Sequence, residues 1–187
     1  NNFRQPRLSP TADRFVVQIP PSMDLWTYHF GRGTSIKLTS DRIIASSAPA
    51  WTPDGSRVVF ATWFDGEVGL GWVHADGSSR VEELIKGVGM RSFERTHPVM
   101  LPDGSGVNMT GLAPGGAVED LLFVPLNKER RLETVFQAPG VERNPAIAPS
   151  GRFVAYNSDE SGTSQVYVRP FPNAGSRQWQ ISTDGGA

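Results

Sequence analysis

Short stretches in which hydrophobic and polar residues alternate occur along the whole chain, separated by residues that favour turns. In the first quarter of the sequence such stretches cover residues 14–19, 24–30 and 35–39. Alternation with a period of two is typical of a half-buried β-strand. The prolines 20–21 and the glycine-rich residues 31–33 lie between these stretches. They predict turns that join consecutive strands of one sheet.

The same order of strands and turns continues to the end of the chain. No segment has a sustained helical period, although residues 81–88 also fit a short helix. We therefore predict an all-β fold of four antiparallel four-stranded sheets, with no helix longer than two turns. The further strands expected from this pattern are residues 58–62, 70–74, 81–85, 107–112, 120–124, 132–136, 153–156, 165–168 and 178–181.

A proline-bounded motif precedes the second strand of each sheet and divides the chain into repeats. Its copies begin at Pro6, Pro49, Pro98 and Pro145, at intervals of 43, 49 and 47 residues. This period is typical of four-stranded propeller blades. We predict one array over residues 1–187, with blades at about residues 1–48, 49–97, 98–144 and 145–187.

A constant spacing inside the repeats suggests a fixed hairpin. In each copy an aromatic residue of the third strand precedes an apolar residue of the fourth strand by 12 positions. We therefore expect the four aromatic residues to be buried at equivalent places between blades. The pairs are Trp26 and Leu38, Trp72 and Leu84, Phe123 and Val135, and Tyr167 and Trp179.

Composition and charge exclude several classes of function. The chain has 187 residues, of which 38% are hydrophobic and 20% charged, so it can bury a core. The net charge is −1 and the basic residues are scattered, which argues against nucleic-acid binding. The absence of cysteine excludes disulfides, thiolate catalysis and cysteine-type zinc sites. No apolar run approaches the length of a membrane span, and without an initial methionine we expect a piece of a longer protein.

Turn aspartates recur in the repeats and invite comparison with metal ligands or acid–base catalysts. They are Asp13, Asp54 and Asp103. Aspartate in a Pro-Asp-Gly turn accepts backbone hydrogen bonds, so we favour a structural role. The acidic loop 157–162 lacks the alternating oxygen ligands and the terminal glutamate of a calcium loop. We expect no metal site.

No set of residues supplies a nucleophile together with a base. The histidines His29, His74 and His97 have no serine in a Gly-x-Ser-x-Gly turn to activate, and the chain has no phosphate-binding Gly-x-x-x-x-Gly-Lys loop. We therefore predict no catalytic residue, no cofactor and no enzymatic activity in this chain.

The motif residues resemble a known repeat family. The run Pro-x-aromatic-x-Pro-Asp-Gly-x-Arg at residues 49–57, with the strand ends at 38–39 and 181–183, resembles the TolB-type, WD-like β-propeller repeat. The copies depart from this pattern at Ala12, Gly106 and Ser150. Residues 156–162 and 166–172 resemble propellers attached to bacterial membrane-anchored serine/threonine kinases. The resemblance implies a bacterial protein in the periplasm or another extracytoplasmic compartment.

The order of strands also predicts how the array ends. The first copy opens on its inner strand and the fourth closes on its outer strand, so neither end has a strand to lend to the other. We expect an open arc of four blades from a larger propeller of six to eight. Its unmatched apolar end faces would promote self-association.

Cationic residues lead into three of the four innermost strands, whose approaches gather at one mouth of a propeller channel. A cluster of this kind favours an acidic peptide, a carboxylate or an anionic sugar. The alternative is that the side chains are solvated or paired with Glu94 and Glu142. The cationic residues are Arg4, Arg95, His97 and Arg143.

An aromatic pair, Trp63 and Phe64, has no counterpart in the other repeats and lies at the edge of a loop. We keep it as a candidate contact surface. The sequence thus favours a non-catalytic binding or scaffold module that recognises a protein, a peptide or a cell-envelope ligand. The alternative is the accessory propeller of a larger enzyme, either a membrane-anchored serine/threonine kinase or a prolyl-oligopeptidase-type peptidase.

Overall fold

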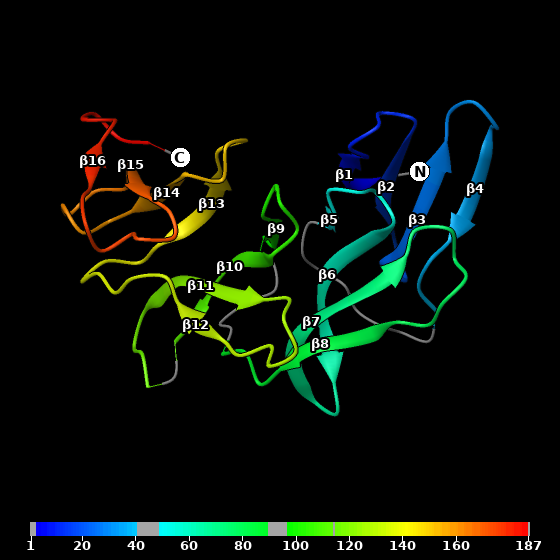
Figure 1. Cartoon of the computed structure of the whole chain (residues 1–187), viewed down its shortest axis with the longest axis horizontal. Coiled ribbons are helices and arrows are strands. Elements are labelled where there is room, and N and C mark those ends of the chain that lie inside the picture. Colours follow the sequence, from blue (N-terminus) through cyan, green and yellow to red (C-terminus); the bar gives the residue numbers. More distant parts are fainter. Residues whose placement is uncertain (1–2, 41–48, 90–96, 114, 187) are drawn as a thin grey trace. The chain divides into compact units, whose positions relative to one another are not determined.

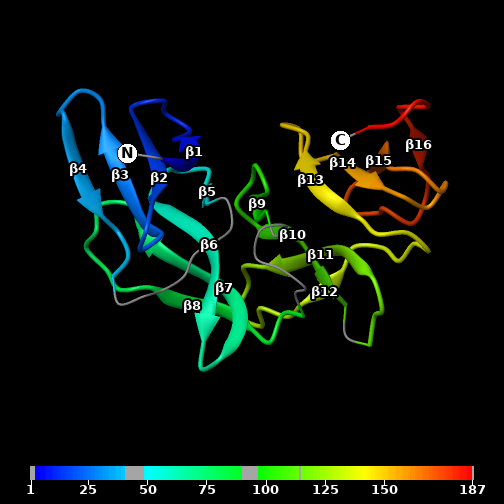
Figure 2. The ribbon, with the colours of Figure 1, turned by 180° about the vertical axis from the view of Figure 1, so that it is seen from behind.

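The computed structural model describes residues 3–40, 49–89, 97–113 and 115–186. Within these ranges the regular structure consists of four antiparallel four-stranded sheets, called blades 1 to 4 (Figures 1 and 2). Strands that follow one another in sequence are neighbours in each sheet. The predicted all-β fold is confirmed, and residues 81–88 contain a strand rather than a short helix. No helix long and apolar enough to cross a membrane occurs in the described residues.

The strands are numbered along the chain. Blade 1 contains β1 (Arg4–Leu8), β2 (Arg14–Ile19), β3 (Asp24–His29) and β4 (Thr34–Lys37). Blade 2 contains β5 (Ala50–Trp51), β6 (Arg57–Phe64), β7 (Glu67–His74) and β8 (Glu82–Lys86). Blade 3 contains β9 (Val99–Met100), β10 (Gly106–Leu112), β11 (Glu119–Pro125) and β12 (Glu133–Thr134). Blade 4 contains β13 (Arg143–Ile147), β14 (Phe153–Ser158), β15 (Gln165–Pro170) and β16 (Trp179–Gln180).

The chain divides into two compact units. Unit 1, Asn1–Gly87, contains blades 1 and 2, and unit 2, Val88–Ala187, contains blades 3 and 4. The packing of blades is therefore described within each unit. The single array over residues 1–187, its division into repeats and the open arc remain predictions.

A turn of the same kind joins the first two strands of every blade. In each turn a backbone N–H donates a hydrogen bond to the carbonyl oxygen of the first residue of the second strand, at 2.9–3.0 Å. Because this bond marks one structural position, it aligns the four blades residue by residue. The bonds join Ser9 to Arg14, Thr52 to Arg57, Leu101 to Gly106 and Ala148 to Phe153.

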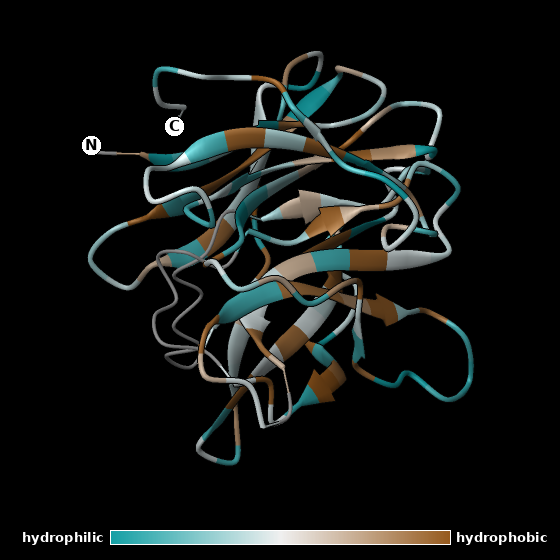
Figure 3. Cartoon of the chain, turned by 90° about the vertical axis from the view of Figure 1, so that its left-hand side faces the viewer, coloured by the Kyte–Doolittle hydropathy of each residue, from teal (hydrophilic) through white to brown (hydrophobic). Residues whose placement is uncertain are grey.

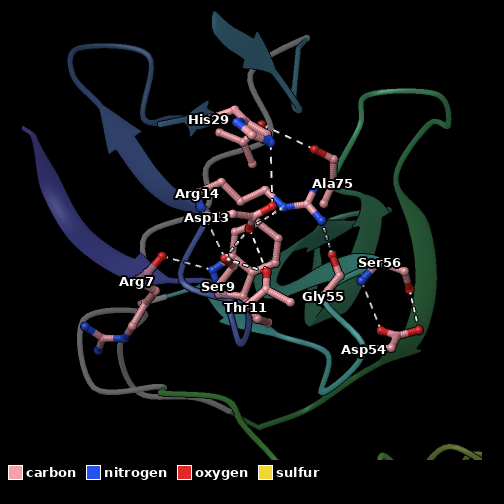
Figure 4. A network of polar contacts seen from close by, with 12 residues as sticks. Arg7, Ser9, Thr11, Asp13, Arg14, His29, Asp54, Gly55, Ser56 and Ala75 are labelled. Carbon is pink, nitrogen blue, oxygen red and sulfur yellow. Dashed lines mark hydrogen bonds and ion pairs between the residues drawn. The ribbon is translucent and has the colours of Figure 1, made fainter. Parts of the chain in front are cut away.

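The aspartates of these turns hold the backbone, as predicted. Asp54 Oδ1 accepts hydrogen bonds from Thr52 Oγ1 at 2.6 Å and from the Ser56 N–H at 3.0 Å. In blade 1 the carboxylate of Asp13 accepts hydrogen bonds from the side-chain hydroxyl groups of Ser9 and Thr11 instead (Figure 4). The hydrogen bond from Thr52, followed by those from Ser56, lowers the pKa of Asp54 to about 2. The carboxylate therefore stays ionised in its structural role.

The two blades of each unit pack through opposite sheet faces. We call face A the face that carries Val58 and Phe60 of β6 and the equivalent residues of the other blades. Face B carries Val16 of β2, Leu25 of β3 and their equivalents. In unit 1, Val16 and Leu25 pack with Val58, Phe60 and Val73 of blade 2. Face B of the earlier blade thus meets face A of the later blade.

Unit 2 has the same arrangement. Leu121 and Phe123, on face B of blade 3, pack with Val154, Tyr156 and Tyr167 on face A of blade 4. Figure 3 shows the apolar positions in brown alternating with polar positions along the strands. Burial of one such apolar side chain stabilises the fold by about 1.5–3 kcal/mol.

The prediction that the four third-strand aromatic residues are equivalent is wrong. Cross-strand pairing places Trp26 and Tyr167 on face A but Trp72 and Phe123 on face B. Only Tyr167 is buried, and the other three are half-buried. The constant spacing misled because β-bulges and different turn lengths change the pairing. In blade 1, for example, the 12-residue spacing joins Trp26 to Leu38, but the residue that pairs with Trp26 across the two strands is Lys37.

Candidate functional site

The innermost strands β1 and β13 begin with the same irregular geometry. In each, the pairing register shifts after an arginine, Arg4 in β1 and Arg143 in β13. The residue after the arginine has a left-handed backbone, with φ of 53° at Gln5 and 52° at Asn144. A proline follows each of them. Blades 1 and 4 therefore share a β-bulge at the position where the chain enters the innermost strand.

This backbone geometry is unfavourable by itself. A left-handed conformation costs an L-residue about 1–2 kcal/mol, and a residue before proline prefers an extended conformation. Such strain persists only where surrounding structure imposes it, and it gathers at ligand-binding sites. Bulges likewise redirect side chains next to functional sites. The two blades thus present an arginine at equivalent positions through equivalent strained backbones.

The two arginines differ in their surroundings. Arg4 is exposed, and its side chain makes no hydrogen bond or ion pair with a described residue. Arg143 is half-buried, and its Nε donates to Glu119 Oε2 at 3.1 Å. Among the described residues, none bonds to its two terminal nitrogens. A guanidinium held through Nε keeps a planar pair of donors for a carboxylate or phosphate.

The acidic partner of Arg143 differs from those that the sequence suggested. The alternative to a ligand site was that the cationic residues are solvated or pair with Glu94 and Glu142, whereas Arg143 pairs with Glu119. Glu94 lies outside the described residues. The N–H of Glu142 donates to the carbonyl oxygen of Glu119 at 2.8 Å, which brings the start of β13 beside the start of β11.

A buried pair of carboxyl groups, Asp120 and Glu142, lies beside this ion pair in the chain. Glu142 is fully buried and its Oε1 accepts a hydrogen bond from Ser158 Oγ at 2.9 Å. Burial, with a contribution from Asp120, raises the pKa of Glu142 to about 8. Burial also raises the pKa of Asp120, which is 3% exposed. At neutral pH the pair therefore retains a proton, and less negative charge surrounds Arg143 than the sequence suggests.

Sequence reasoning missed this acid pair. Asp120 and Glu142 are far apart in sequence, and neither belongs to a recognisable motif. Glu142 could have been selected from the sequence because it directly precedes the first residue of an inner strand. In the described part of the chain, no other blade has an acidic residue at this place.

The remaining predicted site residues have separate positions. His97 is half-buried and lies two residues before β9, whereas Arg95 lies outside the described residues. Trp63, which is 46% exposed, and half-buried Phe64 end β6 at its turn into β7. Arg4 lies at the corresponding edge of blade 1, where β2 turns into β3. Within unit 1, Arg4 and Trp63 thus lie at the corresponding ends of blades 1 and 2.

Comparison with known proteins gives one consistent result. No protein-family model matches the chain. The chain is 26% identical over 137 residues to the Tol-Pal system protein TolB of Bordetella pertussis, a match that covers 73% of this chain and 29% of that protein. It therefore spans less than a third of the curated relatives that it matches.

Solved structures agree on the fold. TolB from Acinetobacter baumannii superposes with a TM-score of 0.79 at 14% identity, over 97% of this chain and 44% of that one. A prolyl endopeptidase structure superposes with a TM-score of 0.68 at 10% identity, over 97% of this chain and 29% of that one. At these identities the similarity concerns the fold alone.

Proposed function

Because the chain is built of TolB-type β-propeller repeats, we propose that it is a non-catalytic binding module. Its ligand is a protein, a peptide or another component of the bacterial cell envelope, and its location is periplasmic or otherwise extracytoplasmic. The observation that carries this proposal is the strained bulge that presents Arg4 in blade 1 and Arg143 in blade 4. Backbone strain of this kind is concentrated at ligand-binding sites, and here it recurs at the entrance of two inner strands.

The chemistry of these residues indicates an acidic ligand. The terminal nitrogens of Arg143 can donate two parallel hydrogen bonds to one carboxylate, the strongest arrangement available to arginine. Glu119 orients this guanidinium, and the retained proton on the buried acid pair limits repulsion of an incoming anion. Arg95 and His97, predicted for the same edge of blade 3, complete the proposed set.

An aromatic contact accompanies the charges. Trp63 is 46% exposed at the edge of blade 2 that corresponds to the position of Arg4 in blade 1. Exposed tryptophan supplies a large contact area at a low cost in conformational entropy, and it is enriched where proteins bind proteins. We therefore propose that Trp63, with the neighbouring Phe64, contacts an apolar residue of the same ligand.

Fluorescence anisotropy with labelled peptides tests the proposal. The probes are a decapeptide with four glutamates, its glutamine counterpart and a lysine counterpart, each at low and moderate salt. We expect only the acidic peptide to bind, and Arg4→Ala together with Arg143→Ala to weaken binding at least tenfold, as loss of charge-assisted hydrogen bonds does. Arg32→Ala, an exposed arginine between β3 and β4, is the matched control. Equal affinity for the three peptides, or no effect of the double variant, would reject the proposal.

The fold similarity to a prolyl endopeptidase keeps a second candidate open. In it the chain is the accessory propeller of a larger enzyme, either a peptidase of that type or a membrane-anchored serine/threonine kinase. Both candidates make this chain itself non-catalytic, so peptidase, esterase and ATPase assays of the purified chain should remain at background. Turnover abolished by one serine or histidine substitution would contradict both. Sequencing the flanking gene, for kinase motifs or a Gly-x-Ser-x-Gly segment, distinguishes them.

A further inference from the structure

An open hollow of about 440 Å³ lies on face A of blade 4, beside the segment that joins blade 3 to blade 4. Cross-strand pairing places Tyr167 of β15 opposite Gln180 of β16 on this face. Small-ligand sites usually enclose about 300–1,000 Å³, so the hollow has room for one. All of its walls belong to unit 2. They are formed by Pro139, Glu160, Ser161, Tyr167, Gln178 and Gln180.

The wall that precedes blade 4 is fixed against a turn of that blade. The N–H of Val141 donates to Asp159 Oδ1, in the turn between β14 and β15, at 2.8 Å. A Cβ on Gly140 would lie 2.6 Å from the backbone nitrogen of Glu160, so this close approach requires glycine. The segment that carries Pro139 is therefore held beside the turn that carries Glu160.

A chain of hydrogen bonds from the interior orients Glu160. Gln178 Nε2 donates to Glu160 Oε1, and Arg169 Nη2 donates to Gln178 Oε1. Arg169 is itself fixed, since its Nε donates to Tyr156 Oη at 2.7 Å and its guanidinium carbon lies 4.2 Å from the ring centre of Phe136. Within the described chain no side chain bonds to Glu160 Oε2. One carboxylate oxygen is thus held in place, and the other can accept hydrogen bonds from a ligand.

The hydroxyl group of Tyr167 is a second unpaired group in the hollow. Tyr167 is 4% exposed, and its ring stacks on that of Tyr156 with centroids 5.9 Å apart. A tyrosine hydroxyl in such a place usually has a hydrogen-bond partner, but none of the described residues bonds to this one. Gln180 Nε2 donates to the carbonyl oxygen of Ser182 at 2.8 Å, and among the same residues Gln180 Oε1 has no partner.

These groups suit a ligand with several hydroxyl groups. A sugar hydroxyl both donates and accepts, so it can donate to Glu160 Oε2 or Gln180 Oε1 and accept from Tyr167. None of the residues that line the hollow is cationic, so a phosphate or carboxylate there would face Glu160 without a partner. The charge of Arg169 offsets that of Glu160, which weakens attraction of an ammonium group. The exposed ring of Pro139 adds an apolar surface for the C–H groups of a sugar.

We propose that this hollow between blades 3 and 4 binds a neutral sugar. Glu160 Oε2 and Gln180 Oε1 accept hydrogen bonds from hydroxyl groups of the sugar, and Tyr167 Oη donates to another. The site is additional to the acidic-ligand site proposed above and shares no residue with it. Failure of either proposal therefore leaves the other standing.

Saturation-transfer difference NMR with hexoses of different charge tests the proposal. The neutral probes are glucose, galactose and mannose, and the charged probes are their uronates and their 2-amino derivatives. We expect at least one neutral hexose to bind in a saturable manner. Its uronate should bind at least tenfold more weakly, because Glu160 repels it. Binding of only the uronates or only the amino sugars, or of no probe at all, would overturn the proposal.

Two conservative variants connect sugar binding with the hollow. Tyr167→Phe removes only the hydroxyl group and should lower the affinity about fivefold, and Glu160→Gln should lower it about tenfold. Tyr167→Phe should keep the wild-type melting temperature, which distinguishes a ligand contact from a structural role. Glu133→Gln, at an exposed residue of β12 that does not line the hollow, is the matched control. Wild-type affinity for the sugar in both variants would reject this site.

Discussion

The buried carboxyl of Glu142 should make unit 2 less stable as the pH rises. Its pKa is about 8 in the folded chain against an ordinary value of 4.5. Between these values the folded state keeps a proton that the unfolded state has released. The stabilisation is therefore complete below pH 4.5 and is lost as the pH rises through about 8.

The magnitude follows from the shift. One pKa unit corresponds to about 1.4 kcal/mol, so the loss is at most about 5 kcal/mol. Two acidic neighbours, Asp120 and Glu160, raise the pKa in addition to burial, and the hydrogen bond from Ser158 lowers it. Because Asp120 shares the retained proton, the loss assigned to Glu142 alone will be smaller than this limit.

Glu142→Gln keeps the shape and the hydrogen-bonding capacity of the side chain and removes its titration. Urea unfolding of unit 2, followed by hydrogen exchange of peptides from β13 and β14 at pH 5, 6.5 and 8, measures the effect. The free energy of unfolding should fall with pH in the wild type and stay nearly constant in the variant. Glu133→Gln, at an exposed residue of β12, is the control. A variant with the wild-type pH dependence would refute the reasoning.

Three further predictions concern the fold. Phe60→Ala, at a residue with 0% exposure in the core of unit 1, should lower the free energy of unfolding by about 3–5 kcal/mol in urea titrations. Gly69→Ala should lower the melting temperature sharply, because a Cβ there would lie 2.1 Å from the Ile85 carbonyl oxygen, whereas Gly175→Ala, with nothing within 4 Å, should not. Asn144→Gly should raise the stability of unit 2 by up to about 1 kcal/mol by relieving its left-handed strain, and a clear loss in calorimetry would count against that strain.

Local patterns predicted most of the fold. Alternation identified the strands, and the boundaries of β2 were predicted to the residue. The turn residues were also informative, because Pro53, Asp54 and Gly55 impose a local backbone conformation that needs no distant partner. Gly55 indeed has φ of 68°.

Cross-strand register was less accessible to sequence. A spacing along the chain fixes the face of a residue only if no bulge intervenes, and β7 pairs with β8 through a bulge between Leu70 and Gly71. Trp72 pairs with Val59, two residues after the start of β6, whereas Trp26 pairs with Val17, three residues after the start of β2, so the two side chains lie on opposite faces.

The candidate site was predicted in part. Arg4 and Arg143 could be selected because each lies two residues before the proline that opens a repeat motif. The partners of Arg143 could not, because Glu119 reaches it through the packing of β11 beside β13. The acid pair depends in the same way on a contact between distant segments. Its raised pKa values arise from burial, which no short motif records.

NMR of the arginine side chains most directly tests the claim that Arg4 and Arg143 bind an acidic ligand. The Nε–Hε signals of Arg4 and Arg143, assigned through single substitutions, can be followed while the acidic decapeptide is added. The account predicts that both signals shift in a saturable manner with one common affinity, while the signal of Arg32 does not move. Binding of the peptide without any change in the signals of Arg4 and Arg143 would contradict it.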